Sequence, residues 1–412
     1  MRPSDIEAIA DLLGEAADAT GGMAQETHAA IARRAFDATG AWGRPVQRMH
    51  DGIAQSVYRG VRLGLRHGAR HAGRAVARSI PEDAPAIGDR TGEAVALGAL
   101  HGFAGDLLER TSNPLAITLE LRVDGRVVIP TAPALAEAYP DATPRLAVFI
   151  HGLCETEHAW RGLPRRGAER DRPMPFPERM REDLGATPLL IRFNSGRHIS
   201  ENAADLEALL AAVVEDWPVP VSDIVLIGHS MGGLIARSAA WKSRNEPWAG
   251  LVRHVICLGT PHHGADLERG VHLLDWALGH TAETRAFSRA LRMRSSGIKD
   301  LRFGSASEED WLDQDPDELM RRRAAEVPFL PHADYCWVSA SPSRGVVGRL
   351  LGDLLVRTPS ASGTGRGTHV PFEIENGHTL HGLTHFDLLD HPAVYEQLLT
   401  WFTRPARLPA RT

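Results

Sequence analysis

The chain has 412 residues, of which 43% are hydrophobic and 24% are charged; these values are typical of a globular protein whose core needs neither a disulfide framework nor a structural metal. Its formal net charge of −6 argues against nucleic acid as the main partner. No apolar stretch approaches the roughly 18 residues of a membrane span, and the N-terminus lacks a secretory signal, so we expect a cytoplasmic protein.

Residues 1–112 are predicted to form a separate helical region, with a long helix from about Met49 to Ser79. Three stripes recur along this helix: an apolar stripe of Val57, Val61, Leu65, Ala69, Ala72 and Val76, an arginine stripe of Arg59, Arg62, Arg66 and Arg70, and a glycine stripe of Gly60, Gly64 and Gly68. Arginine at every fourth position is incompatible with a membrane span. We interpret the helix as part of a bundle with a solvated arginine face, or alternatively as a basic surface that contacts anionic lipid headgroups.

A β-hairpin is predicted to follow this region. Hydrophobic residues alternate with polar ones over 117–123, Asp124-Gly125 is a typical tight-turn pair, and Val127 and Ile129 continue the alternation. Residues 131–144 are rich in proline and alanine and are predicted to be a linker.

From residue 145 onward, short buried strands alternate with helices. Strands are predicted at 145–150, 188–193, 223–227, 254–258, 335–340 and 370–375, and helices at 200–216, 231–243 and 386–402. This alternation predicts an α/β domain over residues 113–405, with a mainly parallel sheet covered by helices on both faces. Residues 262–330 are too long for an ordinary connection and are interpreted as a helical, lid-like insertion.

The strongest chemical signal is the segment GHSMG at 228–232, which matches the pattern G-x-S-x-G. An apolar strand precedes it and a helical pattern follows, which is the setting of a nucleophile elbow. The serine of an elbow lies on a very tight turn, so Gly228 and Gly232 supply the small neighbours that the turn requires, and Gly233 lets the helix pack closely on the sheet. Ser230 is therefore the candidate nucleophile; the alternative is a serine that only caps the helix.

Acyl transfer also requires two backbone N–H groups that stabilise the oxyanion. One comes from the residue after the nucleophile, here Met231, and the other from the loop after an earlier strand, here Leu153. Gly152 lets the backbone of that loop approach the oxyanion. We interpret His151 as a residue that orders the loop rather than as a proton-transfer group.

A serine nucleophile needs a histidine base and an orienting carboxylate, and in this kind of fold the acid precedes the histidine along the chain. The acid is expected in the loop after the strand at 335–340, which makes Asp353 the first candidate. Asp334 precedes that strand and would lie at the wrong end of the sheet, and Asp300 lies in the insertion.

The base is expected after the last strand. The candidates are His378, His381, His385 and His391. His385, at the start of the final helix, is the first of them, and His378 and His381 are the next alternatives. A metal site is another interpretation of these histidines, but no cysteine or carboxylate accompanies them at ligand spacing. We therefore expect neither a metal nor another cofactor.

Several segments together resemble the lipases and esterases of the α/β-hydrolase superfamily. These are HGL at 151–153, GHSMGG at 228–233 and LGTPHHGADL at 258–267, which are most similar to bacterial lipases with a GTPH-G segment and to GPI inositol-deacylase-like hydrolases. GDLLV at 352–356 resembles the acidic motif G-D-G-L/V-V of these enzymes, with Leu354 in place of the second glycine. LTHFDLL at 383–389 resembles their terminal histidine motif.

The resemblance covers residues 115–403 and implies an α/β-hydrolase fold. It assigns the triad roles to Ser230, Asp353 and His385, and the oxyanion roles to Leu153 and Met231. It implies a carboxylic ester hydrolase that works through an acyl-enzyme.

Substrate and partners are less constrained by the sequence. The amphipathic segment VHLLDWALGH at 271–280 indicates an apolar lid and therefore lipid-like or aliphatic esters; the alternative is a helix packed on the core. An acyltransferase or a thioesterase uses the same triad, and a non-catalytic binding protein is a further alternative against which the complete residue set argues. We expect a small-molecule or lipid ester as substrate, no nucleic acid, and peripheral membrane contact if the basic helix acts as a lipid-binding surface; the sequence does not fix the oligomeric state.

Overall fold

The computed structural model describes residues 1–37, 43–161, 173–264, 294–312, 325–343, 353, 355–365 and 368–404. The chain divides into two compact units. The smaller one comprises Met1–Ile87, Arg110–Ala116 and Gly270–Arg294, and the larger one comprises Gly88–Glu109, Ile117–Arg269 and Ser295–Thr412. The helix α3, Thr91–Arg110, thus lies almost entirely in the larger unit, and the boundary predicted at residue 112 does not coincide with the structural one.

Close packing explains why α3 lies with the larger unit. A Cβ atom on Gly98 would lie 2.8 Å from the carbonyl oxygen of Glu155, and one on Gly102 would lie 2.1 Å from Sγ of Cys154. Only glycine allows this approach, so the loop after the strand at 145–150 rests directly on α3.

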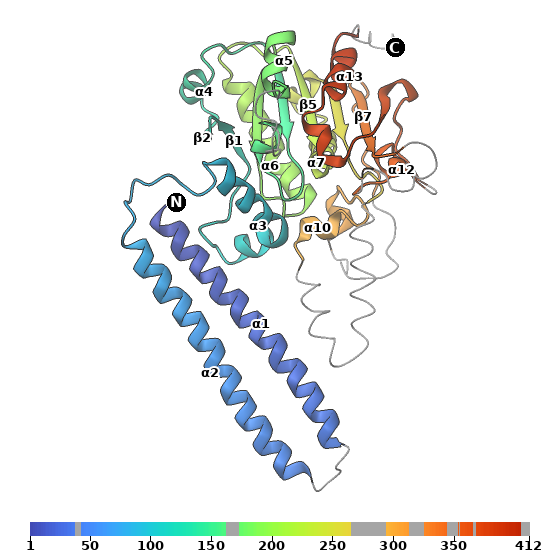
Figure 1. The fold of residues 1–412 in the computed structure, drawn as a ribbon. Coiled ribbons are helices and arrows are strands. Elements are labelled where there is room, and N and C mark those ends of the chain that lie inside the picture. Colours follow the sequence, from blue (N-terminus) through green and yellow to red (C-terminus); the bar gives the residue numbers. More distant parts are fainter. Residues whose placement is uncertain are drawn as a thin grey trace. The chain divides into compact units, whose positions relative to one another are not determined.

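A helical hairpin forms most of the described part of the smaller unit. Its helices are α1, Pro3–Asp37, and α2, Arg44–Ala77 (Figure 1). Arg62 donates two hydrogen bonds to the Asp18 carboxylate, at 2.7 and 2.8 Å, and Arg70 donates one to Asp11 at 2.7 Å. Arg62 and Arg70 of the arginine stripe therefore face α1, and the prediction of a solvated arginine face is wrong at these two positions because α1 offers carboxylates that pair with the guanidinium groups. Arg59 of the same stripe is exposed, as predicted.

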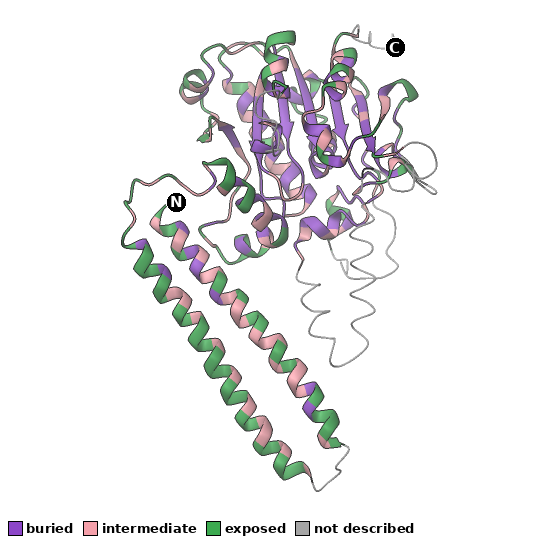
Figure 2. Cartoon of the chain, viewed as in Figure 1, coloured by how far each residue is buried: buried purple, intermediate pink, exposed green. Residues whose placement is uncertain are grey.

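The apolar stripe of α2 is left on the outside of the hairpin. Val57, Val61 and Leu65 are 58%, 53% and 51% exposed, and Figure 2 shows α2 exposed along most of its length. Among the described residues, no helix combines the length and the apolar character needed to cross a membrane.

The larger unit is built on an eight-stranded sheet with the order β10-β7-β6-β5-β3-β4-β1-β2. The strands are β1 Glu120–Val123, β2 Arg126–Val128, β3 Arg145–Ile150, β4 Thr187–Arg192, β5 Asp223–His229, β6 Val252–Leu258, β7 Asp334–Ser341 and β10 Gly377–His381. All neighbours from β10 to β4 are parallel, whereas β1 runs antiparallel to both β4 and β2. A separate two-stranded sheet pairs β8, Thr364–Gly365, with β9, Thr368–His369.

Helices cover both faces of the sheet, as the sequence predicts (Figures 1 and 2). Leu146, Val148 and Ile150 of β3 pack in one core with residues of α6, Ile199–Asp216, and α7, Met231–Lys242. Ala147 and Phe149 alternate with them and pack in a second core with α5, Phe176–Leu184, and α13, Pro392–Phe402. This arrangement is the α/β-hydrolase fold.

Short helices occupy the connections. They are α4 Ala132–Ala138, η2 Glu157–Arg161, η3 Pro247–Leu251, α10 Ser296–Asp300, η4 Glu308–Asp310, α12 Thr358–Ala361, η5 Ile374–Asn376 and η6 His385–Leu389. The predicted linker at 131–144 therefore contains a helix, and the predicted helix at 386–402 is divided before Pro392. The apolar segment at 271–280 lies outside the described residues.

The last strand differs from its prediction. Residues 370–373 form no strand, η5 follows them, and β10 begins at Gly377, where it pairs in parallel with β7. Pro371 cannot donate a hydrogen bond to a sheet, which opposes a strand at 370–375.

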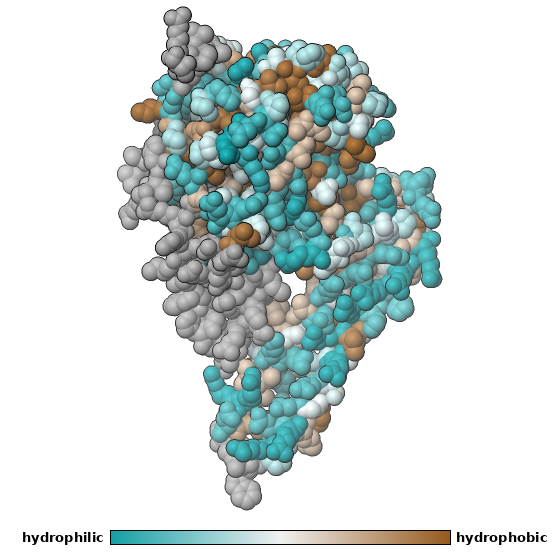
Figure 3. Space-filling model, turned by 180° about the vertical axis from the view of Figure 1, so that it is seen from behind, coloured by the Kyte–Doolittle hydropathy of each residue, from teal (hydrophilic) through white to brown (hydrophobic). Residues whose placement is uncertain are grey.

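The surface of the larger unit is mixed in character. Seen from behind, hydrophobic patches lie among hydrophilic residues, and the hairpin shows mainly hydrophilic residues on that side (Figure 3). Patches of this kind are normal for a folded surface and indicate no binding site by themselves.

Candidate active site

Ser230 forms the turn between β5 and α7. Its backbone has φ 52° and ψ −119°, a conformation that residues other than glycine rarely adopt. Its N–H donates to the carbonyl of Leu258 in β6 at 2.8 Å. Strain of this kind persists only where the surroundings enforce it, and the strand–turn–helix setting is that of a nucleophile elbow.

Glycines make this turn sterically feasible. A Cβ atom on Gly228 would lie 2.3 Å from the backbone of Gly232, and one on Gly232 would lie 2.2 Å from the carbonyl oxygen of Ile150. A Cβ atom on Gly233 would lie 2.0 Å from Oγ1 of Thr260. The need for small residues around Ser230 thus has a direct steric cause.

The loop after β3 passes beside Ser230. A Cβ atom on Gly152 would lie 3.0 Å from Cβ of Ser230. The Gly152 N–H donates to Oε2 of Glu155 at 2.6 Å, so the Leu153 N–H is the candidate oxyanion donor of this loop. Met231, which is fully buried, begins α7 and offers the second amide.

His151 orders this loop. Its Nδ1 donates to the carbonyl of Gly152 at 2.9 Å, and its Nε2 accepts from the N–H of Phe193 at 3.2 Å. The rings of His151 and Phe193 stack, with their centroids 4.0 Å apart. Burial lowers the pKa of His151 to about 4, so the ring is neutral and both of its nitrogens are engaged.

Asp353 and His385 lie in direct contact, and both are almost completely buried. Oδ2 of Asp353 lies 2.6 Å from Nδ1 of His385, and the His385 N–H donates to the Asp353 carbonyl at 3.2 Å. The other carboxylate oxygen, Oδ1, accepts from the N–H groups of Leu355 and Val356 at 3.0 and 2.7 Å. These two amides fix the carboxylate so that it holds the proton of His385 on Nδ1 and leaves Nε2 as an acceptor, as a general base requires.

The imidazole of His385 lies at the same edge of the sheet as Ser230. Gly259 directly follows Leu258, whose carbonyl accepts the N–H of Ser230. A Cβ atom on Gly259 would lie 2.9 Å from the His385 ring. The ring of His229, the residue before Ser230, has its centroid 4.6 Å from that of His385. The fold thus gathers Ser230, Asp353 and His385 where the carboxyl ends of β5, β6 and β7 meet.

The alternative acids and bases have other surroundings. His378 of β10 pairs with Val338 of β7, and His381 ends β10 with an exposed side chain. Asp300 contacts His198 at 3.1 Å and accepts the N–H of Ile199 at the start of α6. Asp334 begins β7, at the edge of the sheet opposite to Ser230.

Two residues beside these groups were missed by the sequence reasoning: His229, which is fully buried, and Glu155, whose side chain is 9% exposed. Nδ1 of His229 lies 2.9 Å from Oε2 of Glu155, and its Nε2 lies 3.3 Å from the carbonyl oxygen of His385. Burial opposes both charges, but each charge stabilises the other, so the pKa of Glu155 is lowered and the pKa of His229 is raised. Both residues lie in segments that the sequence analysis noted, Glu155 in HGLCE and His229 in GHSMG. Nothing in the sequence indicates that the two contact each other.

The LGTPHHG segment has a structural role here. Arg237 of α7 donates to Nδ1 of His262 at 2.8 Å and to the carbonyl of Val327 at 3.0 Å. Burial and the Arg237 charge hold the pKa of His262 well below its usual range, so His262 is a neutral acceptor. The segment thereby ties the elbow helix to the loop after β6.

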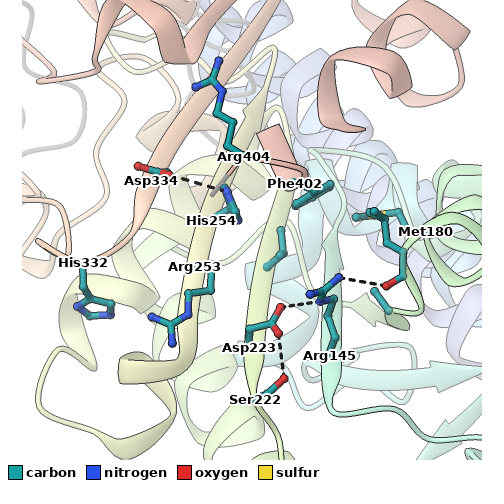
Figure 4. Close-up of a pocket in the computed structure, with 13 residues that line it drawn as sticks. Arg145, Met180, Ser222, Asp223, Arg253, His254, His332, Asp334, Phe402 and Arg404 are labelled. Carbon is teal, nitrogen blue, oxygen red and sulfur yellow. Dashed lines mark hydrogen bonds and ion pairs between the residues drawn. The ribbon is translucent and has the colours of Figure 1, made fainter. Parts of the chain in front are cut away.

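A pocket of about 300 Å³ lies at the opposite edge of the sheet (Figure 4). Its lining includes Arg145, Asp223 and Asp334, the first residues of β3, β5 and β7. Arg145 donates to Asp223 at 3.0 Å. The pocket is therefore separate from the candidate active site. Within the described ranges, no three histidine, cysteine, aspartate or glutamate side chains gather as metal ligands would.

Residues 191–294, which include the elbow, match the family model of the PGAP1-like alpha/beta domain. This match confirms the resemblance drawn from the motifs. No curated protein matches the chain.

Similar solved structures include two bacterial lipases and the protein EstA. The lipase BlEst2 of Bacillus licheniformis in mature form is 18% identical, with 63% of this chain and 92% of that chain covered and a TM-score of 0.40. EstA of Clostridium botulinum is 13% identical, with 65% and 89% covered and a TM-score of 0.40. The Staphylococcus hyicus lipase is 14% identical, with 63% and 94% covered and a TM-score of 0.33.

Proposed function

We propose that this protein is a serine hydrolase that cleaves carboxylic esters through an acyl-enzyme. The observation that carries the proposal is the buried 2.6 Å contact between Asp353 and His385, at the sheet edge where Ser230 occupies a strained turn. An activated serine needs a base within reach and a carboxylate that orients the base, and this arrangement supports the assignment of these roles to His385 and Asp353.

In the proposed reaction, Nε2 of His385 takes the proton of Ser230 as Oγ attacks the ester carbonyl carbon. The carbonyl π electrons move to the oxygen, which accepts hydrogen bonds from the amides of Leu153 and Met231. The start of α7 adds the positive end of the helix dipole at this position. His385 then gives the proton to the leaving alkoxide, and a water molecule, activated by the same base, releases the acid and restores Ser230.

Ser230→Ala tests the assignment. We expect kcat for short p-nitrophenyl esters to fall on the order of 10⁶-fold, because the nucleophile is removed. Labelling by a fluorophosphonate probe should disappear as well. Ser238→Ala on the same helix is the matched control, since the Ser238 hydroxyl only donates to the carbonyl of Ala306 at 2.6 Å. Equal turnover in wild type and Ser230→Ala would refute the proposal.

The substrate class proposed is lipid-like or aliphatic esters, on the strength of the apolar sequence segment at 271–280. A series of p-nitrophenyl esters from acetyl to dodecanoyl tests it, with kcat/KM expected to rise with chain length. Activity confined to acetyl esters would contradict the lipid interpretation. Formation of an alkyl ester in the presence of an alcohol would instead identify an acyltransferase.

We further propose that α2 contacts anionic membrane surfaces. Its outer face exposes Val57, Val61 and Leu65, and exposed Arg59 and Arg74 lie on the same helix, a composition suited to anionic headgroups above an apolar boundary. Flotation with phosphatidylserine-containing vesicles should therefore exceed flotation with phosphatidylcholine vesicles and should fall with salt.

Point variants are the appropriate test of this contact, because deletion of residues 1–112 would also remove α3 from the larger unit. Val57→Ser with Val61→Ser should abolish flotation, whereas Val127→Ser on the exposed strand β2 should leave it unchanged. Undiminished flotation of the double variant would refute this contact.

A further inference from the structure

We propose that Glu155 and His229, whose side chains are 9% and 0% exposed, form a positioning device that holds both the oxyanion loop and the base His385 in place around Ser230. Neither residue is a member of the triad or an oxyanion donor, and each acts through a neighbour. The inference rests on the proposed function, since it assigns a role within that reaction.

The first link runs from Glu155 to the oxyanion loop. Oε2 of Glu155 accepts the Gly152 N–H at 2.6 Å, directly before the candidate donor Leu153. A Cβ atom on Gly152 would lie 3.0 Å from both this oxygen and Cβ of Ser230. The carboxylate thus fixes the loop where it passes the nucleophile. The close contact of Gly98 in α3 with the Glu155 carbonyl holds the loop from its other side.

The second link runs from His229 to the base. Nε2 of His229 lies 3.3 Å from the carbonyl oxygen of His385, while the N–H of His385 donates to the Asp353 carbonyl at 3.2 Å. Both backbone polar groups of His385 are therefore engaged, one by the triad acid and one by His229. A base held in this way cannot shift without breaking a buried hydrogen bond.

The pair makes three hydrogen bonds that depend on its ionic form. Both ring nitrogens of His229 face oxygen acceptors, which requires two N–H donors and hence an imidazolium beside a carboxylate. Oε2 of Glu155 accepts from both Gly152 and His229. A neutral pair, such as glutamine with neutral histidine, satisfies only two of these three bonds.

Because a neutral pair must lose one of the three hydrogen bonds, Glu155→Gln tests the positioning role most directly. If the glutamine oxygen occupies the position of Oε2, His229 keeps its Nδ1 proton and loses the bond to His385. If the glutamine NH2 group faces His229, the Gly152 N–H loses its acceptor. Either outcome loosens one catalytic element while the shape of the side chain is preserved.

The experiment compares Glu155→Gln, His229→Gln and the double variant with wild type, using a p-nitrophenyl ester. We expect each single variant to lower kcat by about 10²-fold, since a displacement of about 1 Å has an effect of this size. KM should stay within a factor of about three, because substrate binding is not altered. The double variant should be no slower than the slower single one, since the residues act as a unit.

A spectroscopic readout accompanies the kinetics. Nitrogen-15 NMR should show two N–H protons on the His229 ring in wild type and one in Glu155→Gln. His254→Gln is the matched control: this histidine, whose side chain is 14% exposed, lies in β6 at 3.9 Å from Asp334, at the opposite edge of the sheet, and its replacement should leave kcat unchanged. Thermal unfolding of each variant verifies folding, and if His229→Gln does not fold, the shape-preserving Glu155→Gln decides.

The outcomes separate the two proposals. Hydrolysis that depends on Ser230 but persists at full kcat in Glu155→Gln overturns the positioning role alone. A change in KM without a change in kcat, or an equal loss in His254→Gln, also overturns it. Wild-type turnover equal to that of Ser230→Ala overturns the proposed function and the positioning role together.

Discussion

Replacement of Asp353 by asparagine tests the triad sharply, because the structure dictates how the new side chain must lie. Oδ1 of Asp353 accepts two backbone N–H groups, from Leu355 and Val356. An amide NH2 group cannot accept hydrogen bonds, so the asparagine oxygen must keep that position. The NH2 group then takes the place of Oδ2, which lies 2.6 Å from Nδ1 of His385.

This orientation reverses the proton arrangement of the base. Nδ1 of His385 becomes an acceptor, its proton moves to Nε2, and Nε2 can no longer take the proton of Ser230. The same exchange in the serine-protease triad lowers kcat about 10⁴-fold. We expect a similar loss here, which corresponds to about 5 kcal/mol of transition-state stabilisation.

Steady-state hydrolysis of a p-nitrophenyl ester at neutral pH measures the effect, and labelling by a fluorophosphonate probe should slow in parallel. Asp334→Asn is the control, since Asp334 begins β7 at the opposite edge of the sheet and its replacement should leave kcat within a factor of about two. A folded Asp353→Asn protein with kcat within about tenfold of wild type would refute the reasoning.

Three further predictions concern stability and reactivity. Gly228→Ala should lower the free energy of unfolding by about 1–3 kcal/mol, because its Cβ atom would lie 2.3 Å from the backbone of α7. Gly64→Ala, in open space on α2, should raise it by up to about 1 kcal/mol; equal thermal shifts would contradict the steric argument. Glu157→Gln removes the carboxylate that lies 2.6 Å from the buried Arg192 guanidinium, and it should lower the free energy of unfolding by about 3–5 kcal/mol at pH 7. Burial opposes the Glu157 charge but Arg192 outweighs it, so its pKa is lowered, and the stabilisation is present at neutral pH and lost as the pH falls through that lowered pKa. In urea titrations, the difference in free energy of unfolding between wild type and Glu157→Gln should therefore shrink in acid. A difference that stays constant with pH would contradict the ionic origin of this stabilisation. Burial raises the pKa of Cys257 to about 12, so alkylation at pH 8 should require unfolding, and rapid labelling of the native protein, followed by mass spectrometry, would disprove its burial.

Where local pattern governs, the sequence predicts the structure well. The strand predicted at 145–150 is β3, Arg145–Ile150, and the helix predicted at 200–216 is α6, Ile199–Asp216. The hairpin turn at Asp124-Gly125 has positive φ at both residues, as its composition indicates. These features depend on residues that are neighbours in the chain, so periodicity and turn chemistry are sufficient to identify them.

Where a contact between distant segments decides the outcome, the sequence pattern was misleading. The helix that carries the stripes is present as α2, but Arg62 and Arg70 of the arginine stripe pack against α1, because Asp18 and Asp11 of α1 lie opposite to them. Likewise, the pattern at 370–375 favours a strand, yet the segment at 377–381 pairs with β7 instead.

The sequence by itself determined the fold class, the strained serine between a strand and a helix, and the order in which the acid and the base follow it. The tertiary structure decided which acid meets which histidine. Asp353 and His385 are 32 residues apart, and Glu155 and His229 are 74 apart. No repeat or local rule links residues at such distances. Their contact follows only when parallel strands bring their carboxyl ends to one edge of the sheet, where a carboxylate removed from water needs hydrogen-bond donors.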